Sequence, residues 1–147
     1  MQLYFAYGSN MSKEQMNNRC PNHKYFGHGT LKGFRWIITE RGYANIIKSE
    51  ADEVHGVVYK INEEDEASLD KSEGVLKGSY RKETLRIEIE KTNYPCLVYI
   101  DPIEAEGSPK EEYVSRINRG VSDAKLYPEY VERYIRKFIP LSASSNQ

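Results

Sequence analysis

The fold of this protein is decided by residues 3–10, which read LYFAYGSN. Positions 3–7 are apolar or aromatic and predict a buried strand. Gly8 ends that strand. Because it has no Cβ atom, Gly8 permits a positive φ angle and lets a ligand approach the backbone closely. We therefore expect the strand to leave the core at this glycine, followed by a loop that can contact a ligand.

A helix is expected directly after this loop. Ser12 and Gln15 fit the N-cap and N3 positions of a capping box. The helix should span 12–19 and end before Cys20 and Pro21, because the residue before a proline disfavours helical backbone. A strand, a glycine turn and a helix start leave several backbone N–H groups pointing one way, which suits a carboxylate, a phosphate or a developing oxyanion. An ordinary strand-to-helix turn has the same pattern.

The composition is that of a soluble globular domain: 147 residues, 39% hydrophobic and 29% charged. We expect one domain over 1–141, followed by a small, polar and disordered tail at 142–147. Lys and Arg number 21 against 22 Asp and Glu, which gives no support for a nucleic-acid or membrane partner. Without a membrane-length apolar run or a signal-like segment, we expect a cytoplasmic location.

The next part of the chain is rich in β-branched and aromatic residues. Three such runs, at 34–39, 44–47 and 54–61, with breaks at Gly29, Gly33 and Gly42, predict three or four strands. An N-cap at Asn62 with acidic residues behind it then predicts a short helix. That helix should end near Gly74, a candidate C-cap glycine.

The remainder predicts a hairpin and two helices. Apolar and charged residues alternate over 85–89, as in a half-buried strand, and a turn at 91–93 should pair it with 95–100. Ser108 fits an N-cap with proline at N1, which predicts a helix start. A second helix should begin near Pro128.

Glu73 is the strongest candidate for acid–base chemistry. It lies at the expected helix exit, where the negative end of the helix dipole disfavours an ionised carboxylate. Apolar and aromatic neighbours such as Tyr80 would also raise its pKa, towards the range of a general acid–base near neutral pH. A solvated glutamate at a helix end is the alternative interpretation.

Other reactive side chains give weaker signals. The three histidines, His23, His28 and His55, lack metal-ligand spacing, and we expect no metal site. Cys20 and Cys96 should be free thiols, and Cys20 has no evident base that would make it a nucleophile. The 12 tyrosines suit polar pockets and interfaces.

Three segments together resemble the γ-glutamylcyclotransferase family: residues 4–10 (YFAYGSN), 69–74 (LDKSEG) and 78–80 (GSY). Residues 53–61 and 113–134 also resemble the corresponding parts of that family, so the resemblance covers nearly the whole chain in order. YGSN followed by the glutamate element, residues 69–74, and by Tyr80 is far more specific than YGSN alone. The resemblance implies an α+β single domain with a mixed, barrel-like β-sheet and flanking helices.

The resemblance also implies a reaction without metal or cofactor. The α-amine of a γ-glutamyl compound attacks its own γ-carbonyl and releases 5-oxoproline and an amino acid or amine. Glu73 would transfer the protons, and the first loop would hold either the α-carboxylate or the oxyanion. We therefore expect Glu73 and the loop to share one pocket. The substrate-binding residues implied are Tyr7, Gly8, Ser9, Asn10, Tyr80, Tyr99 and Tyr113, with Tyr99 and Tyr113 the weaker matches.

Several alternatives stay open. The substrate class could be a γ-glutamyl amine or a γ-glutamyl group that protects a biosynthetic intermediate. A non-catalytic small-molecule binding domain of the same fold is the third alternative, against which the presence of Glu73 argues. The expected partner is a small-molecule γ-glutamyl substrate, and a homodimer is left open. Two departures from the family occur: the connection before Val54 looks shorter than in vertebrate members, and His55 and Tyr59 replace common tryptophans, which should affect packing only.

Overall fold

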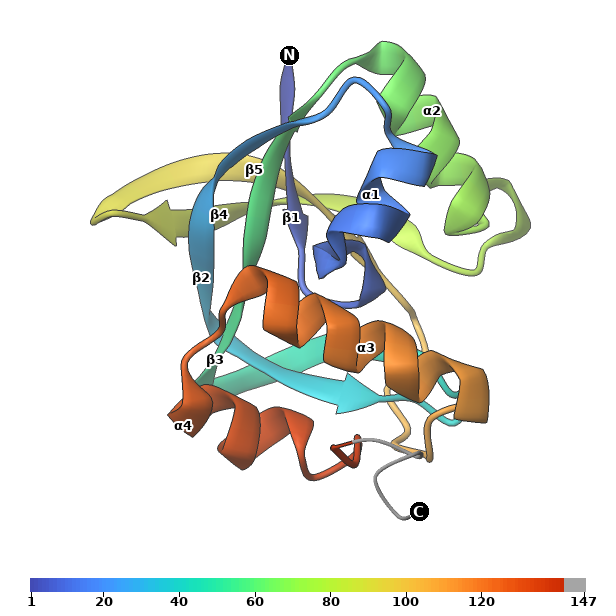
Figure 1. Ribbon diagram of the computed structural model, residues 1–147, viewed down its shortest axis with the longest axis vertical. Coiled ribbons are helices and arrows are strands. Elements are labelled where there is room, and N and C mark those ends of the chain that lie inside the picture. Colours follow the sequence, from blue (N-terminus) through green and yellow to red (C-terminus); the bar gives the residue numbers. More distant parts are fainter. Residues whose placement is uncertain (142–147) are drawn as a thin grey trace.

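Figure 1 shows the computed structural model of the protein, which describes residues 1–141. Five strands close into a barrel in the order β1-β3-β2-β4-β5. β5 runs parallel to β1, whereas the other pairs are antiparallel. The mixed, barrel-like α+β fold is thereby confirmed, while the predicted tail at 142–147 lies outside the described residues. The strands are β1 (Gln2–Ala6), β2 (Lys24–Ile38), β3 (Ala44–Ile61), β4 (Arg81–Ile89) and β5 (Thr92–Ile100).

Two long strands, β2 and β3, replace the three or four expected, so that prediction was wrong. They pair from Lys24↔Lys60 to Ile38↔Ala44. The register shifts between Lys32 and Phe34, where Gly33 has a φ of +86°. This glycine therefore marks a bulge within a continuous strand instead of a strand end.

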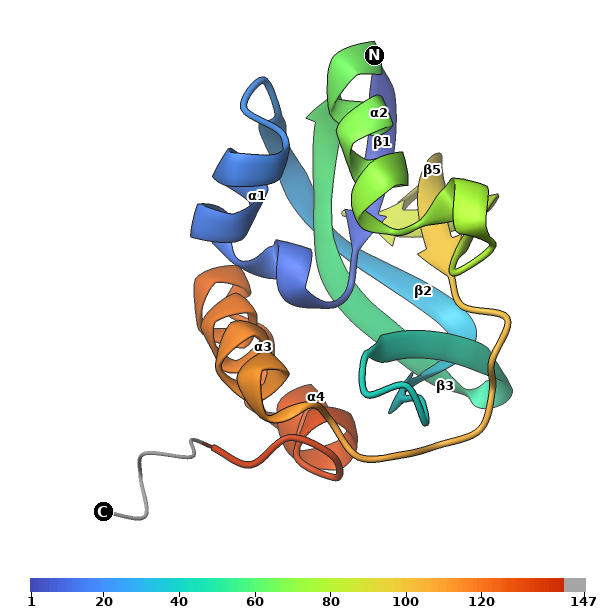
Figure 2. The ribbon, with the colours of Figure 1, turned by 90° about the vertical axis from the view of Figure 1, so that its right-hand side faces the viewer.

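Helices cover two parts of the barrel (Figures 1 and 2). α1 and α2 lie on one part and α3 and α4 on another, and the loop after β1 passes between the two pairs. No helix within residues 1–141 has the length and apolar character needed to cross a membrane. The helical elements are η1 (Ser9–Met11), α1 (Lys13–Arg19), α2 (Glu63–Ser72), η2 (Val75–Lys77), α3 (Glu111–Ala124), α4 (Pro128–Tyr130) and a π-helical turn, η3 (Val131–Ile135).

The caps of α1 and α2 form largely as the sequence predicts. The Ser12 hydroxyl accepts a hydrogen bond from the Gln15 N–H at 3.3 Å. The Gln15 side chain turns to the first loop instead of the N-cap backbone, so only half of that capping box forms. Asn62 and Asp65 form a complete capping box at the start of α2. Gly74 follows that helix with a φ of +64°, as expected for a C-terminal glycine.

The start of α3 differs from the prediction. Its N-cap is Lys110 instead of Ser108, and no side chain caps it. The preceding segment is held by backbone hydrogen bonds from Gly107 N–H to the Ile38 carbonyl at 2.9 Å and from Lys110 N–H to the Gly42 carbonyl at 3.1 Å. These hydrogen bonds to the end of β2 and to the β2–β3 turn hold residues 107–110 in a non-helical conformation, so α3 begins later than the sequence predicts. The β4–β5 turn also shifts, because the positive φ angles fall at Glu90 and Lys91.

Strand β1 connects two hydrophobic clusters. Phe5 lies in the larger one, with Trp36 of β2 and Ile117 of α3, and all three side chains are fully buried. Its neighbours Tyr4 and Ala6 face the second cluster, which packs beneath α1 and α2. Because successive strand residues point to opposite sides, one short strand fixes both clusters and sets the position of the loop that follows it.

Candidate active site

Tight packing, and not a positive φ angle, favours glycine at position 8. Its φ and ψ are −123° and −135°, so the loop does not use the positive φ that a glycine permits. A Cβ atom at this position would lie 3.2 Å from the Tyr113 hydroxyl oxygen and 3.3 Å from the Ala44 Cβ. Glycine therefore lets helix α3 and strand β3 approach the loop closely.

The first loop presents free backbone donors. It turns through η1, in which Met11 N–H bonds the Gly8 carbonyl at 3.1 Å and Ser12 N–H bonds the Ser9 carbonyl at 3.0 Å. No hydrogen bond joins the backbone N–H groups of Gly8, Ser9 or Asn10 to another of the described residues 1–141. These amides are consequently available to an anionic group.

Asn10 fixes the conformation of this loop. Its side-chain amide donates to the Tyr4 hydroxyl at 2.9 Å and accepts from Gln15 at 2.8 Å and from Arg19 at 3.0 Å. Its backbone carbonyl accepts from the Tyr59 hydroxyl at 2.9 Å. Tyr59, expected to affect packing only, therefore also holds the loop. Both the nitrogen and the oxygen of the Asn10 side-chain amide are thus engaged in holding the loop.

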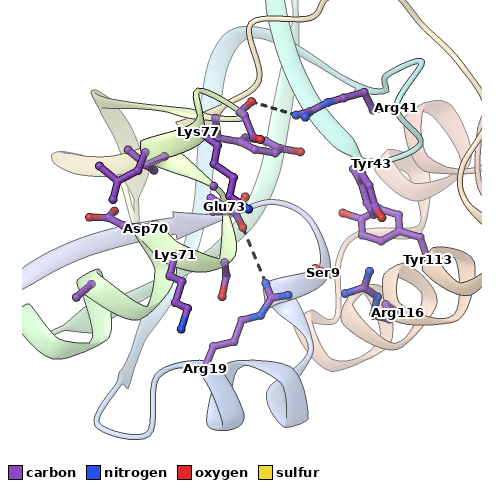
Figure 3. A pocket seen from close by; sticks show the side chains of 17 residues that line it. Ser9, Arg19, Arg41, Tyr43, Asp70, Lys71, Glu73, Lys77, Tyr113 and Arg116 are labelled. Atoms are coloured by element: carbon purple, nitrogen blue, oxygen red, sulfur yellow. Dashed lines mark hydrogen bonds and ion pairs between the residues drawn. The ribbon is translucent and has the colours of Figure 1, made fainter.

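Glu73 is the C-cap residue of α2, directly before Gly74. Its side chain is 18% exposed and its carboxylate lies 3.9 Å from the Arg19 guanidinium (Figure 3). Within residues 1–141 no hydrogen-bond donor meets this carboxylate at bonding distance. Burial raises the pKa of Glu73 from 4.5 to about 6, although the positive charges of Arg19, Arg116 and Arg41 oppose the shift.

Glu73 and the first loop face the same cavity. The open part has a volume of about 910 Å³, and a narrow part of about 40 Å³ shares Ser9, Glu73, Tyr80 and Tyr113 with it. Every residue that the sequence suggested for the site lines one of these two parts: Tyr7, Gly8, Ser9, Asn10, Glu73, Tyr80, Tyr99 and Tyr113.

The tyrosine hydroxyls of the narrow part bond to the protein itself. Tyr7 donates to the Tyr99 carbonyl at 2.5 Å, Tyr80 to the Ala44 carbonyl at 2.9 Å, and Tyr99 to Asp70 at 2.7 Å. None of these bonds reaches Glu73. Burial raises the pKa values of Tyr7, Tyr80 and Tyr99. The tyrosines are therefore neutral walls that shape the space around one carboxylate.

Three arginines of the site were not predicted from the sequence. Arg19, Arg41 and Arg116 surround the opening near Glu73 and come from three different elements (Figure 3). Arg116 lies 5.0 Å from the centre of the Tyr113 ring, one helical turn further along α3, and that i, i+3 spacing was a usable signal. Nothing in the local sequence marks Arg41, which follows β2.

The remaining candidates lie elsewhere. Cys20 is fully buried, and burial raises its pKa to about 12, so it is a neutral core thiol and not a nucleophile. His23, His28 and His55 bond to separate partners. Within residues 1–141 no group of three or more His, Cys, Asp or Glu residues is arranged to hold a metal ion.

A family model described as gamma-glutamyl cyclotransferase, AIG2-like, matches residues 4–116. The matched range contains the first loop, Glu73 and all three arginines. The chain belongs to this cyclotransferase family. The resemblance carried by YGSN and the glutamate element is thereby confirmed at the level of the family.

Individual members of the cyclotransferase family align with most of the chain. The human gamma-glutamylcyclotransferase is 31% identical over 142 residues, which cover 89% of this chain and 76% of the human protein. A solved structure of a gamma-glutamyl cyclotransferase superposes with a TM-score of 0.82 at 30% identity, covering 90% of this chain and 85% of that one. YkqA from Bacillus subtilis superposes with a TM-score of 0.80 at 28% identity, covering 96% of this chain and 55% of that one.

Proposed function

We propose that this protein converts a γ-glutamyl amino acid to 5-oxoproline and the free amino acid. The observation that carries the proposal is the placement of one half-buried, weakly paired carboxylate, Glu73, on the same cavity as the free amides of the first loop. Family membership supports the same reaction.

Glu73 has the properties that proton transfer requires. With a pKa of about 6, it is mostly ionised at neutral pH and accepts a proton from the substrate's α-ammonium. The resulting amine attacks the γ-carbonyl carbon, a ring C–N bond forms, and the bond to the leaving nitrogen breaks. One of the three ammonium protons stays as the lactam N–H. The other two end on the leaving nitrogen, which departs as an ammonium group.

The first loop stabilises negative charge. Its amides can bind the α-carboxylate, or the oxyanion that forms when the γ-carbonyl is attacked. Asn10 and its partners hold the loop before substrate arrives, so little reorganisation is needed during the reaction. The neutral tyrosine walls favour a folded substrate, which brings amine and carbonyl together in an intramolecular attack.

The test is a product assay on purified protein. γ-Glutamyl amino acids, γ-glutamyl amines and glutathione are incubated separately, and released 5-oxoproline is quantified, with Glu73→Gln as the matched inactive control. We expect release from γ-glutamyl amino acids. Release from amines alone would identify a γ-glutamylamine cyclotransferase. Binding without release from any compound would favour a non-catalytic domain.

A further inference from the structure

Arg19 contacts both parts of the site that the proposed reaction uses. Its Nη1 nitrogen donates to the Asn10 side-chain oxygen at 3.0 Å and lies 3.9 Å from a carboxylate oxygen of Glu73 (Figure 3). Asn10 belongs to the loop whose backbone amides are free, and Glu73 is the candidate base. Within residues 1–141 no other cation approaches the Glu73 carboxylate at ion-pair distance. One guanidinium therefore connects the base to the anion-binding loop.

The backbone that carries this guanidinium is well anchored. Arg19 is the last residue of α1, and the next residue, Cys20, is fully buried. The Cys20 thiol donates to the Asp65 carbonyl at 3.6 Å, and the Asn22 N–H donates to the Asp65 carboxylate at 3.4 Å. The end of α1 is thus fastened to the start of α2. From this fixed position the Arg19 side chain reaches Glu73 at the other end of α2.

A basic residue in the last turn of α1 has a simpler explanation, because a cation there favours the negative end of the helix dipole. A side chain in open solvent would satisfy the dipole equally well. Arg19 is instead only 26% exposed, lines the cavity and makes its contacts with Asn10 and Glu73. Its direction is therefore explained by the site and not by the helix.

We propose that Arg19 is a positioning residue of the cyclotransferase reaction, which holds the Glu73 carboxylate beside the anion-binding amides and favours its ionised form. The inference rests on the proposed function. Arg19 acts through Glu73 and Asn10 and not on the reacting atoms. An opposite charge at this distance stabilises the carboxylate that accepts the substrate's proton, and it assists the return of that proton to the leaving nitrogen.

Two further arginines face Glu73 but are paired with carboxylates of their own. Arg41, in the β2–β3 turn, pairs with Asp101 at 2.6 Å, and Arg116 of α3 pairs with Glu112 at 3.2 Å. Burial raises the pKa of Glu73, and among the three arginines that oppose this shift Arg19 has the largest effect, ahead of Arg116 and Arg41. Removing Arg19 therefore removes the strongest single stabilisation of the Glu73 charge.

The other titratable groups around Glu73 are neutral or more distant. Asp70 and Lys71 of α2 and Lys77 of η2 line the cavity, and neither lysine forms an ion pair with Glu73. Burial raises the pKa values of the tyrosines near Glu73, so they bring no charge at neutral pH. These are Tyr4 and Tyr7 of β1, Tyr80 and Tyr113.

The first measurement reads Glu73 directly and needs no turnover. Protein labelled with ¹³C at its glutamate carboxyls is titrated by NMR, and the Glu73 signal is assigned by its absence from Glu73→Gln. We expect a wild-type midpoint of about 6. Arg19→Gln should raise this midpoint by about 0.5–1 pH unit, because loss of an opposite charge disfavours the ionised carboxylate. Arg19→Lys keeps the charge, and its midpoint should lie closer to wild type than to Arg19→Gln.

The second measurement is the pH dependence of kcat/KM on a γ-glutamyl amino acid that the wild type accepts. Relative to wild type, Arg19→Gln should lose about two- to fivefold more at about pH 6 than at about pH 8, because a smaller fraction of Glu73 is ionised at the lower pH. Gln15→Met is the matched control, since Gln15 donates to the same Asn10 oxygen at 2.8 Å and is uncharged. It should lose the same factor at both pH values and keep the wild-type midpoint.

Arg119→Gln controls for net charge. Arg119 of α3 is 60% exposed, pairs with Glu14 at 2.6 Å and lies outside the Glu73 cavity, so this variant should match wild type in both measurements. An unchanged Glu73 midpoint in folded Arg19→Gln, with 5-oxoproline still released, would overturn the inference and leave the proposed function intact. An equal midpoint shift in Arg119→Gln would overturn it too. Absence of 5-oxoproline from every γ-glutamyl compound would overturn the proposed function and, with it, the role of Arg19.

Discussion

The two ends of helix α2 each hold a carboxylate shielded from solvent, Asp65 fully and Glu73 in part, and the two environments contrast. Asp65, near the N-terminus, is 1% exposed and accepts hydrogen bonds from the backbone N–H groups of Asn62 and Asn22, both at 3.4 Å. Glu73, at the C-terminus, meets no donor within the described residues and has one guanidinium 3.9 Å away. The helix dipole favours the charge at the first position and disfavours it at the second.

This difference separates a carboxylate that supports the fold from one that is suited to proton transfer. Donors and the helix dipole stabilise the Asp65 charge, so it contributes to folding. The Glu73 charge is poorly solvated and costs stability, but its raised pKa of about 6 suits a base that must also return its proton. Exchanging or removing each carboxylate tests this comparison.

The largest effect is expected for Glu73→Gln on the rate. Glutamine keeps the shape but accepts no proton at neutral pH, so kcat for 5-oxoproline release should fall by about 10²–10⁴-fold or more. KM should change little if Glu73 acts mainly in the transition state. In the wild type, kcat/KM should decline below about pH 6 as Glu73 becomes protonated. Near wild-type turnover by the folded variant would reject Glu73 as the base.

Asp65→Ala should reduce stability without affecting catalysis. The change removes the capping-box acceptor and leaves two backbone N–H groups without their partner. We expect the free energy of unfolding to fall by about 1–3 kcal/mol, measured by urea denaturation. The kcat of the folded fraction should stay within about twofold of wild type, because Asp65 lies outside the cavity. A large loss of kcat in folded protein would contradict the division of roles.

Glu73→Gln should have the opposite effect on stability. A pKa raised from 4.5 to about 6 means that the folded state binds the proton more tightly than the unfolded state. Wild-type stability therefore loses up to about 2 kcal/mol from this group as the pH rises from about 4.5 to 6.

The variant lacks this titration. It should be more stable than wild type by about 1–2 kcal/mol at pH 7, and the difference should vanish below about pH 4.5. Denaturation of both proteins across this pH range measures it. A variant less stable than wild type at pH 7 would show that the Glu73 charge is favourably solvated.

The smallest effect is expected for Tyr80→Phe. Its hydroxyl donates to the Ala44 carbonyl at 2.9 Å and forms no bond with Glu73, so its role is to shape the cavity wall. Loss of one such bond corresponds to about 1 kcal/mol, and kcat/KM should fall by less than about tenfold. Steady-state kinetics of Tyr80→Phe and Glu73→Gln, measured side by side, rank the two losses of kcat/KM. Equal losses in the two variants would assign Tyr80 a direct part in proton transfer.

The sequence by itself determined the features that form within about one helical turn. Residues 3–7 as a buried strand, the Ser12 N-cap, the Asn62 N-cap and the position of Glu73 before a left-handed Gly74 all followed from neighbouring residues. Such features depend on local hydrogen bonds and on backbone freedom, which the side-chain types set directly. The family was also recognisable, because YGSN and the glutamate element occur in order.

Only the tertiary structure decided the environment of the site. Burial of Glu73 depends on contacts from distant segments, and the backbone bonds of Gly107 and Lys110 delayed α3 beyond the local helix signal at Ser108. Arg41 reaches the cavity because β2 and β3 form long paired strands and not the separate short ones that glycines suggested. Charge, burial and pKa are properties of what surrounds a side chain, and those surroundings come from residues far apart in the sequence.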